Sequence, residues 1–465
     1  MAKPHSIFAC TECGAQQPRW LGRCPECGAW STLQQESVGG GSAEMPPQNL
    51  LAKVDQGAPK PLSLGEIDPE QAPRLSTGIP ELDRVLGGGL VPGSVLLLAG
   101  EPGIGKSTLA LQLAAALPGG ARVLYVAGEE SPEQIRLRAD RLPTLPVNLV
   151  VLAETRVEEL ADPWRELDPA VVLVDSVQTL RTARVESAPG SVAQVRESAS
   201  LLAAAARAQG AALVLVGHVT KEGAIAGPRV LEHLVDVVLQ FEGDRGHAFR
   251  LLRAHKNRFG STQEVGVFRM GPSGLEAVGN PSELFLAERS GGAPGSCVVP
   301  LLEGSRPMLV EIQALVAPAG YGTARRTAIG VEDGRVALLL AVLERRAGVD
   351  LASRDVYVNV VGGVRVSEPA ADLALALALA SSRLDIPLPD DVVACGEVGL
   401  GGEIRRVPRS DLRVAEALRL GFRRVLLPEA ASELRGGAAA KALVGVRDLA
   451  SALAWLRAED RSTAT

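Results

Sequence analysis

Short apolar runs alternate with longer amphipathic segments between residues 75 and 279. The apolar runs predict buried strands over residues 95–99, 123–126, 171–174, 212–216, 235–241 and 249–254. Helix signals occur between strands, for example the leucine- and alanine-rich segment 108–114. Strands that alternate with helices indicate an α/β domain with a mainly parallel central sheet covered by helices.

A second α/β pattern begins near residue 280. It predicts strands over residues 308–316, 356–360, 392–396 and 424–427, and alanine- and leucine-rich helices over residues 372–382 and 411–420. A chain of 465 residues is too long for one hydrophobic core. We therefore predict four parts: a cysteine-rich segment at 1–35, a glycine- and proline-rich linker at 36–70, a first α/β domain at 71–280 and a second at 281–465.

Composition narrows the class of protein. Hydrophobic residues make up 46% of the chain and charged residues 22%, a balance typical of soluble globular proteins. No apolar run approaches the roughly 20 residues of a membrane span, and residues 1–9 lack the apolar core of a signal peptide. We therefore expect a cytoplasmic protein with no membrane partner. The net charge of −6 excludes a globally basic nucleic-acid binder, so any site for a polyanion must be local.

Four of the six cysteines lie within the first 27 residues, as two C-x-x-C pairs: Cys10 with Cys13, and Cys24 with Cys27. Two such pairs supply four thiolates, the ligand set of a structural, tetrahedral Zn²⁺ site with no open position for catalysis. Metal binding would also fold a segment that is too short to make its own core. The alternative is a redox-active dithiol, which does not need two pairs.

A phosphate-binding loop follows the first predicted strand. The pattern G-x-x-x-x-G-K-[ST] is matched by Gly100, Glu101, Pro102, Gly103, Ile104, Gly105, Lys106 and Ser107, and Thr108 continues into a predicted helix. Glycines let backbone N–H groups surround phosphate oxygens, and the helix N-terminus adds the positive end of its dipole. Lys106 would reach the β- and γ-phosphates of ATP, and the Ser107 hydroxyl would bind Mg²⁺.

Further polar residues follow other predicted strands, whose carboxyl ends meet at one edge of a parallel sheet. Asp175 ends one strand and could hold the water shell of Mg²⁺. Glu129 and Glu130 end another, and one of them is the natural general base, although spacing alone does not choose between them. His218 could sense the γ-phosphate, and a surface histidine is the equal alternative.

Two longer motifs resemble those of a known family. Residues 75–94, which begin Leu75-Ser76-Thr77-Gly78 and lead into the phosphate loop, resemble the start of a RecA-type ATPase core. The segment Lys256-Asn257-Arg258-Phe259-Gly260 matches the KNRFG signature of the bacterial RadA/Sms DNA-repair family. The four-cysteine segment and the second α/β domain are also similar to that family, so the resemblance covers essentially the whole chain.

The resemblance implies a RecA-like P-loop core that assembles on DNA as a ring, expected to be a hexamer. Family members look like helicases that drive branch migration in homologous recombination. The implied partners are therefore single-stranded and branched DNA and the recombinase RecA. Alignment with RecA-type cores favours Glu129 as the catalytic glutamate. It also implies that Lys256 and Arg258 stabilise charge on the γ-phosphate of an adjacent subunit.

Two segments that follow core strands are candidates for DNA contact. They are residues 178–194, with Arg181 and Arg184, and the glycine-containing residues 221–229. Loops with scattered cations suit contact with the DNA backbone, but an ordinary surface loop is nearly as good an explanation for each. Basic residues within 245–263, and seven arginines within 405–424, predict further positive surfaces for DNA or for a neighbouring subunit.

The second α/β domain resembles the proteolytic domain of Lon protease. The position of the Lon nucleophile falls on Ala370, and the position of its catalytic lysine falls near Asp411. A Ser–Lys dyad needs both a hydroxyl and an amine, so we expect no peptidase activity. The leading hypothesis is a DNA-dependent ATPase that acts on recombination intermediates. The alternatives are a Lon-type ATP-dependent protease or unfoldase, and a non-catalytic scaffold or clock-type ATPase of the RecA superfamily.

Overall fold

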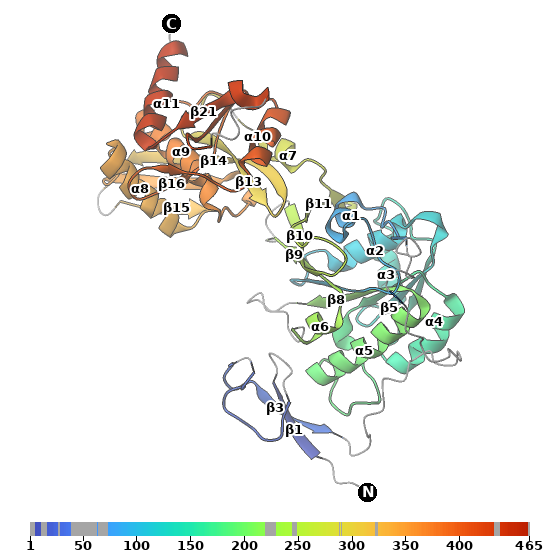
Figure 1. Ribbon diagram of the computed structural model, residues 1–465. Coiled ribbons are helices and arrows are strands. Elements are labelled where there is room, and N and C mark those ends of the chain that lie inside the picture. Colours follow the sequence, from blue (N-terminus) through green and yellow to red (C-terminus); the bar gives the residue numbers. More distant parts are fainter. Residues whose placement is uncertain are drawn as a thin grey trace. The chain divides into compact units, whose positions relative to one another are not determined.

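The computed structural model describes residues 5–10, 16–26, 28–38, 63, 73–218, 229–243, 249–287, 289, 291–320, 324–431 and 438–463. The chain divides into two compact units, Met1–Gly279 and Asn280–Thr465 (Figure 1). The first unit begins with a small antiparallel ribbon in the order β2-β1-β3. Its strands are β1 (His5–Cys10), β2 (Gln16–Gln17) and β3 (Leu33–Val38).

A large sheet follows in the first unit, with the strand order β12-β11-β10-β9-β4-β8-β7-β5-β6. The parallel strands are β4 (Val95–Gly100), β5 (Val123–Ala127), β6 (Leu149–Leu152), β7 (Val171–Asp175), β8 (Ala212–His218) and β9 (Val237–Glu242). The strands β10 (Phe249–Asn257), β11 (Val265–Gly271) and β12 (Gly274–Ala277) extend one side in antiparallel fashion. The prediction of a mainly parallel sheet is confirmed.

Helices cover both faces of this sheet (Figure 1). Leu96 and Leu98 of β4 face one apolar layer, which includes side chains of α1 (Pro80–Leu86), α2 (Lys106–Ala116) and α3 (Pro132–Ala139). Leu97 of β4 faces the other layer, with α4 (Ala161–Leu167), α5 (Val192–Gln209) and α6 (Arg229–Leu234). A strand buried on both faces reads as a continuous apolar run, which is why these strands were visible in the sequence.

The second unit contains a mixed sheet in the order β15-β16-β14-β13-β17-β20-β21. Its strands are β13 (Ser296–Glu303), β14 (Arg306–Pro318), β15 (Arg326–Ile329), β16 (Arg354–Val360), β17 (Val392–Ala394), β20 (Arg424–Pro428) and β21 (Leu443–Val446). The helix α9 (Asp372–Leu384) packs on β13 and β14, and α8 (Asp333–Ala347) and α11 (Leu449–Thr463) lie against α9. The helices α7 (Pro281–Leu286) and α10 (Ser410–Arg419) also pack on this sheet.

The central helix α9 is buried along most of its length. Every residue from Asp372 to Ser381 is buried, including polar ones, so no face of this segment is left for solvent. A helix that is apolar all round belongs inside a core, which explains its alternating alanines and leucines. Among the residues that the structure describes, none of the helices combines the length and apolar character needed to span a bilayer.

Candidate active site

The phosphate loop connects β4 to α2 at the carboxyl edge of the parallel strands. Ile104 is buried and fixes the loop to the core, whereas Glu101, Pro102 and Gly103 are exposed. Ser107 and Thr108 lie half-buried in the first turn of α2, where backbone N–H groups have no intrahelical partner. The loop therefore presents N–H groups and hydroxyls at the positive end of a helix dipole.

Gly105 shows why this loop needs glycine. Its φ of 121° is rarely adopted by residues with a side chain, and an added Cβ would lie 3.1 Å from Met270 Cε and 3.2 Å from Leu275 Cδ1. These neighbours belong to β11 and β12, at the antiparallel side of the sheet. Side chains of the antiparallel strands β11 and β12 thus pack against the phosphate loop at Gly105 and leave no room for a side chain there.

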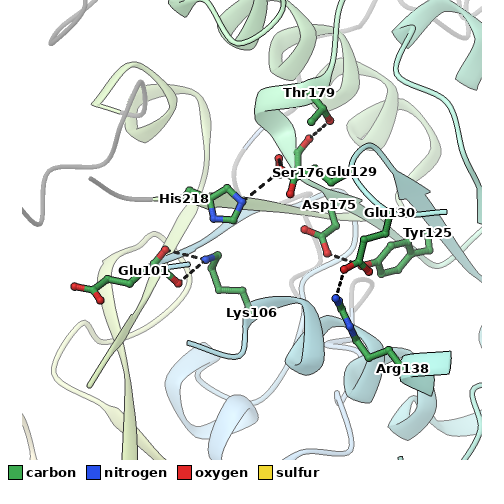
Figure 2. A network of polar contacts seen from close by, with 11 residues as sticks. Glu101, Lys106, Tyr125, Glu129, Glu130, Arg138, Asp175, Ser176, Thr179 and His218 are labelled. Atoms are coloured by element: carbon green, nitrogen blue, oxygen red, sulfur yellow. Dashed lines mark hydrogen bonds and ion pairs between the residues drawn. The ribbon is translucent and has the colours of Figure 1, made fainter. Parts of the chain in front are cut away.

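Lys106 is buried at the start of α2 (Figure 2). Its Nζ donates hydrogen bonds to the carbonyl oxygens of Gly100, at 2.8 Å, and Glu101, at 2.9 Å. Burial lowers the pKa of Lys106 to about 8, and the nearby carboxylates of Asp175 and Glu129 limit the fall. The charge of the loop lysine therefore changes within the mildly alkaline range.

Asp175 ends β7, and its carboxylate is oriented by a buried tyrosine (Figure 2). The hydroxyl of Tyr125, on the neighbouring strand β5, donates to Asp175 Oδ2 at 2.6 Å. Burial, and then the charge of Asp175, raises the pKa of Tyr125 far above its usual value, so the tyrosine remains a neutral donor. The donor set of Asp175 and Ser107, a carboxylate and a hydroxyl, fits the oxygen preference of Mg²⁺.

The two glutamates after β5 have different partners (Figure 2). Glu130 forms an ion pair with Arg138 of α3. Glu129 Oε1 accepts a hydrogen bond from the hydroxyl of Ser176, and it lies 3.4 Å from Nε2 of His218. Glu130 is thus tied to a helix of its own segment, whereas Glu129 faces residues at the ends of β7 and β8.

Local chemistry fixes the chain on both sides of these glutamates. Ser131 caps α3, with its Oγ accepting from the N–H of Gln134 and its own N–H donating to Gln134 Oε1, and Pro132 takes the first turn. On the other side, the N–H of Gly128 donates to the carbonyl of Asp175 at 2.8 Å.

His218 lies at the end of β8 and pairs in register with Gly100, the first residue of the phosphate loop. Its Nδ1 is buried and has no hydrogen-bond partner among the residues that the structure describes. The His218 side chain is 34% exposed, and its Nε2 lies close to Glu129 beside the phosphate loop, so a role at the γ-phosphate stays a prediction. Its position at a strand end was visible in the sequence, but its carboxylate partner was not.

The KNRFG segment lies at the opposite edge of the sheet from the phosphate loop. β10 runs antiparallel to β9, and Asn257 pairs with Val237 at the start of β9. Gly100 of the loop pairs with Phe241, near the other end of the same strand. Four residues of extended strand separate these points by about 13 Å. Within one chain, the segment and the loop therefore occupy opposite edges.

The two cations of this segment face the connection between α6 and β9. The Nζ of Lys256 donates to the carbonyl oxygens of Glu232, at 2.5 Å, and Val235, at 2.7 Å. Arg258 Nη1 donates to Asp236 Oδ1 at 3.0 Å. Burial, and then the charge of Arg258, lowers the pKa of Lys256. Both cations are therefore held by local partners.

The remaining residues of the motif hold it against α1. Asn257 Nδ2 donates to the carbonyl of Val85 at 3.2 Å, and Asn257 Oδ1 accepts from the N–H of Phe259 at 2.9 Å. Arg74 Nη2 donates to the carbonyl of Phe259 at 2.5 Å. A Cβ added to Gly260 would lie 3.1 Å from Asn257 Nδ2. The KNRFG motif thus forms a turn whose conformation depends on Asn257, Phe259 and Gly260.

The ribbon shows two of the four predicted zinc ligands. Cys10 and Cys24 are buried, and Cys10 Sγ donates to Thr32 Oγ1 at 3.1 Å. The N–H of Gly28 donates to the carbonyl of Cys24 at 2.9 Å, and Gly28 has a φ of 75°, so the chain after Cys24 forms a tight turn. Two buried thiols beside such a turn fit a structural zinc ribbon. Cys13 and Cys27 lie outside the described residues.

The sequence of this chain is similar to those of known proteins. Residues 60–224 match the family model of an AAA domain, and residues 8–35 match that of a rubredoxin metal binding domain. DNA repair protein RadA of Halalkalibacterium halodurans is 51% identical over 92% of this chain and 93% of its own length. The chain belongs to the bacterial RadA family of DNA repair proteins.

Further relatives span nearly all of the chain. DNA repair protein RadA of Bacillus subtilis is 49% identical over 97% of this chain and 99% of its own length. The Escherichia coli protein of the same name is 48% identical with the same coverage. The protein therefore combines a RecA-like ATPase domain, which binds ATP, with an N-terminal zinc ribbon.

Several predicted positive surfaces are neutralised by acidic partners. Arg253 pairs with Glu242 at 2.7 Å, Arg405 with Glu403 at 2.5 Å, Arg419 with Glu416 at 2.8 Å, and Arg424 with Asp391 at 2.5 Å. Arg245 lies outside the described residues. These ion pairs reduce the local positive charge that the arginine count alone suggests, and contact of these surfaces with DNA or a neighbouring subunit stays a prediction.

Of the two candidate segments for DNA contact, the first lies wholly within the described residues and the second lies mostly outside them. In residues 178–194, the Gln194 side chain donates to the carbonyls of Thr182, Val185 and Ser187 and closes the segment onto itself. Arg184 of this segment lies 3.5 Å from Glu197. Residues 219–228, which make up most of the second segment, lie outside the described residues.

The positions of the Lon dyad are occupied by a different arrangement. Ala370 is buried in a turn before α9, and Asp411 is exposed in the first turn of α10. Arg413, fully buried two residues later, binds both carboxylate oxygens of Glu368, at 2.9 and 2.6 Å. It also donates to the carbonyl of Pro300 at 2.5 Å. An ion pair between the buried Arg413 and the partly exposed Glu368 therefore links these two segments.

Proposed function

We propose that this protein is a DNA-stimulated ATPase that works as a ring, expected to be a hexamer, on recombination intermediates. It would bind single-stranded DNA and use ATP hydrolysis to drive branch migration, as a helicase or translocase in homologous recombination and repair. The recombinase RecA is the expected protein partner. Membership of the RadA family supports the role in DNA repair, and the RecA-like domain supports the ATPase activity.

The observation that supports the proposal is the separation of the phosphate loop from the KNRFG segment within one chain. The phosphate loop lies at the carboxyl edge of the sheet, and Lys256 and Arg258 lie at the opposite edge. These cations cannot reach nucleotide bound in their own subunit across about 13 Å of sheet. Head-to-tail association would bring one subunit's KNRFG edge to the next subunit's loop, and it forms a ring when the rotation between subunits closes.

The residues at the carboxyl edge suit ATP hydrolysis. Lys106 would contact the β- and γ-phosphates, and Ser107 and Asp175 would hold Mg²⁺, which neutralises phosphate charge when bound. Glu129 is our candidate for the group that orients the attacking water, because Glu130 is engaged by Arg138. Lys256 and Arg258 of the neighbour would stabilise charge developing on the γ-phosphate.

Mixing two inactive variants tests the shared site. Lys106→Ala lacks the loop lysine but keeps its KNRFG cations, and Lys256→Ala has the reverse defect. In random one-to-one mixtures, about a quarter of the sites would combine an intact loop with an intact neighbouring cation, so ATPase activity should return. The double variant Lys106→Ala/Lys256→Ala, mixed with either single variant, should restore none.

A matched control separates catalysis from local structure. Arg207 also approaches Asp236, at 3.5 Å, and is half exposed. Arg207→Ala should keep nearly full DNA-stimulated activity, whereas Arg258→Ala should lose it while still binding ATP. Mixtures that stay inactive, although size measurements show that the subunits exchange, would contradict a site shared between neighbours.

The Lon-type protease is the alternative. Residues 280–465 contain a single lysine, Lys441, which lies in a short helical turn before β21. Alanine stands at the nucleophile position, and a buried Arg413–Glu368 pair stands nearby. We therefore expect no cleavage of casein in the presence of ATP. Cleavage that survives rigorous purification and is lost in Lys106→Ala would favour the protease.

A further inference from the structure

The two largest side chains of the N-terminal ribbon lie on its surface. Trp20 is 57% exposed and Trp30 is 72% exposed. The ribbon interior is formed instead by smaller side chains, among them Cys10, Cys24 and Leu33. A buried indole removes about 150–250 Å² of mostly apolar surface from water. A fold that leaves two indoles exposed therefore forgoes a large hydrophobic stabilisation. Exposed aromatic clusters of this kind mark binding surfaces.

The two indoles are neighbours. A Cβ placed at Gly22 would lie 3.8 Å from Cη2 of Trp20 and 3.9 Å from Cζ3 of Trp30, so both rings border the same residue without a side chain. The N–H of Ser31 donates to the carbonyl of Gly22 at 2.8 Å, which holds the segment that carries Trp30 beside Gly22. Arg23 pairs with Trp30 in an antiparallel bridge.

Positive charge lies beside the rings. The guanidinium of Arg23 sits 5.7 Å from the centre of the Trp30 ring, and its Nε donates to the carbonyl of Gly28 at 2.8 Å. Arg19, next to Trp20 in the chain, is exposed. The ribbon also carries the exposed Glu26, so the positive charge is local to the arginines beside the indoles. It is complementary to an anionic ligand that has flat apolar faces.

We propose that Trp20 and Trp30 form a stacking platform for the bases of single-stranded DNA, with Arg19 and Arg23 beside its phosphates. The inference rests on the proposed function, since it assumes that the protein binds DNA, and it adds a second place of contact outside the ATPase domain. Bases stack on indoles whatever their sequence, because every base has a flat π face. The platform would therefore hold single strands without sequence preference and would not accommodate paired bases.

The test uses the full-length protein and a labelled oligothymidylate. Trp20→Ala and Trp30→Ala should each weaken binding by about 5- to 150-fold, the range found for losing one stacked base. Trp20→Phe and Trp30→Phe keep a stacking face and should restore most of the affinity. An abasic oligonucleotide of the same length should bind wild type and the alanine variants equally, because it has nothing to stack.

Tryptophan emission gives a second, direct measurement. The chain has four tryptophans: besides Trp20 and Trp30, Trp164 is fully buried, and Trp455 lies under the guanidinium of Arg424 at 5.8 Å. Oligothymidylate should quench wild-type emission, and the quenching should persist in the matched control Trp455→Phe but disappear in the Trp20→Phe/Trp30→Phe pair. Zinc content equal to wild type shows that each variant keeps its ribbon.

The outcomes separate the platform from the proposed function. Wild-type affinity in the alanine variants, together with wild-type emission that oligothymidylate does not quench, would overturn the platform. Failure of the wild-type protein itself to bind single-stranded DNA, or to be stimulated by it, would overturn the proposed function as well. Weakened binding that the phenylalanine variants rescue, on normal but not on abasic DNA, would support the platform.

Discussion

Gly128 precedes the proposed catalytic glutamate, and replacing it with alanine should stop turnover without stopping ATP binding. A Cβ at this position would lie 1.8 Å from Thr179 Oγ1 and 2.9 Å from Thr179 Cβ. An ordinary contact needs 3.4 Å or more, so Thr179 would have to rotate and give up its hydrogen bond to Ser176, or the two segments would have to separate by about 1.6 Å. The φ of Gly128 is not in the left-handed region, so crowding is the sole effect expected.

Hydrogen bonds on both sides restrict how Gly128 and Thr179 can move apart. Gly128 is bound through its N–H to Asp175, and Thr179 is bound through its hydroxyl to the carbonyl of Ser176 at 2.8 Å. Either Glu129 moves with Gly128, or the turn that holds Ser176 against Glu129 moves instead. A misplacement of about 1 Å can cost a factor of 100 in rate, so kcat should fall at least about 100-fold, or about 2.7 kcal/mol.

The assay compares turnover with nucleotide binding. Steady-state ATPase rates, with and without single-stranded DNA, should drop in Gly128→Ala, while the Kd for a fluorescent ATP analogue should stay within about threefold of wild type, since the phosphate loop follows a different strand. Gly334→Ala in α8 is a matched control, because a Cβ there meets nothing within 4 Å. Thr179→Ala removes the clashing hydroxyl and should return part of the activity to the double variant.

Two results would refute this reasoning. Wild-type kcat in Gly128→Ala would show that the turn at Thr179 yields without moving Glu129. An equal loss of ATP affinity and turnover would show that the substitution damages the whole carboxyl edge rather than the position of one carboxylate.

Two other predictions concern Lys106 and Arg413. The Lys106 ammonium is charged below its pKa of about 8 and neutral above it, so ATP affinity should fall as the pH rises, by up to about tenfold at pH 9. Titrations of the Kd between pH 7 and 9 measure this, and Lys106→Arg, whose charge does not change, should give a flat profile; a flat wild-type profile would contradict the prediction. Arg413→Ala leaves the Glu368 carboxylate, a quarter exposed, without its buried partner and should destabilise the second unit by up to about 3 kcal/mol, at the low end of the range for buried pairs. Glu368→Leu/Arg413→Met should lose less, although it removes the acceptor of the Leu302 N–H. Calorimetry of the full chain measures both variants, and a loss below about 1 kcal/mol in the single variant would argue against a stabilising pair.

Local signals in the sequence predicted most of the fold of the first unit. The run from Val171 to Asp175 reads as a buried strand because helices cover both faces, and the aspartate marks the strand's carboxyl end. Ser131 and Pro132 indicate the start of a helix, because an N-cap serine and a first-turn proline favour helix formation through contacts within a single turn. Patterns of this kind need no knowledge of distant residues, which is why they can be interpreted from one sequence.

Contacts between distant segments could not be predicted in this way. Ser176 and Glu129 are 47 positions apart, and Arg413 and Glu368 are 45 apart. The need for glycine at position 128 likewise depends on Thr179, on a different loop. Counting arginines in residues 405–424 suggested a positive surface, because the count does not show that Asp391 and Glu459 lie beside Arg424.

The separation of the phosphate loop and the KNRFG turn to opposite edges of one sheet also has a genetic consequence. On the proposed arrangement, a subunit with a defective turn keeps its own loop but disables its neighbour's. In a cell that makes equal amounts of defective and normal protein, random assembly of six subunits would leave about one ring in sixty without a defective copy. Alleles that alter Lys256 or Arg258 should therefore be dominant, whereas alleles that prevent folding should be recessive.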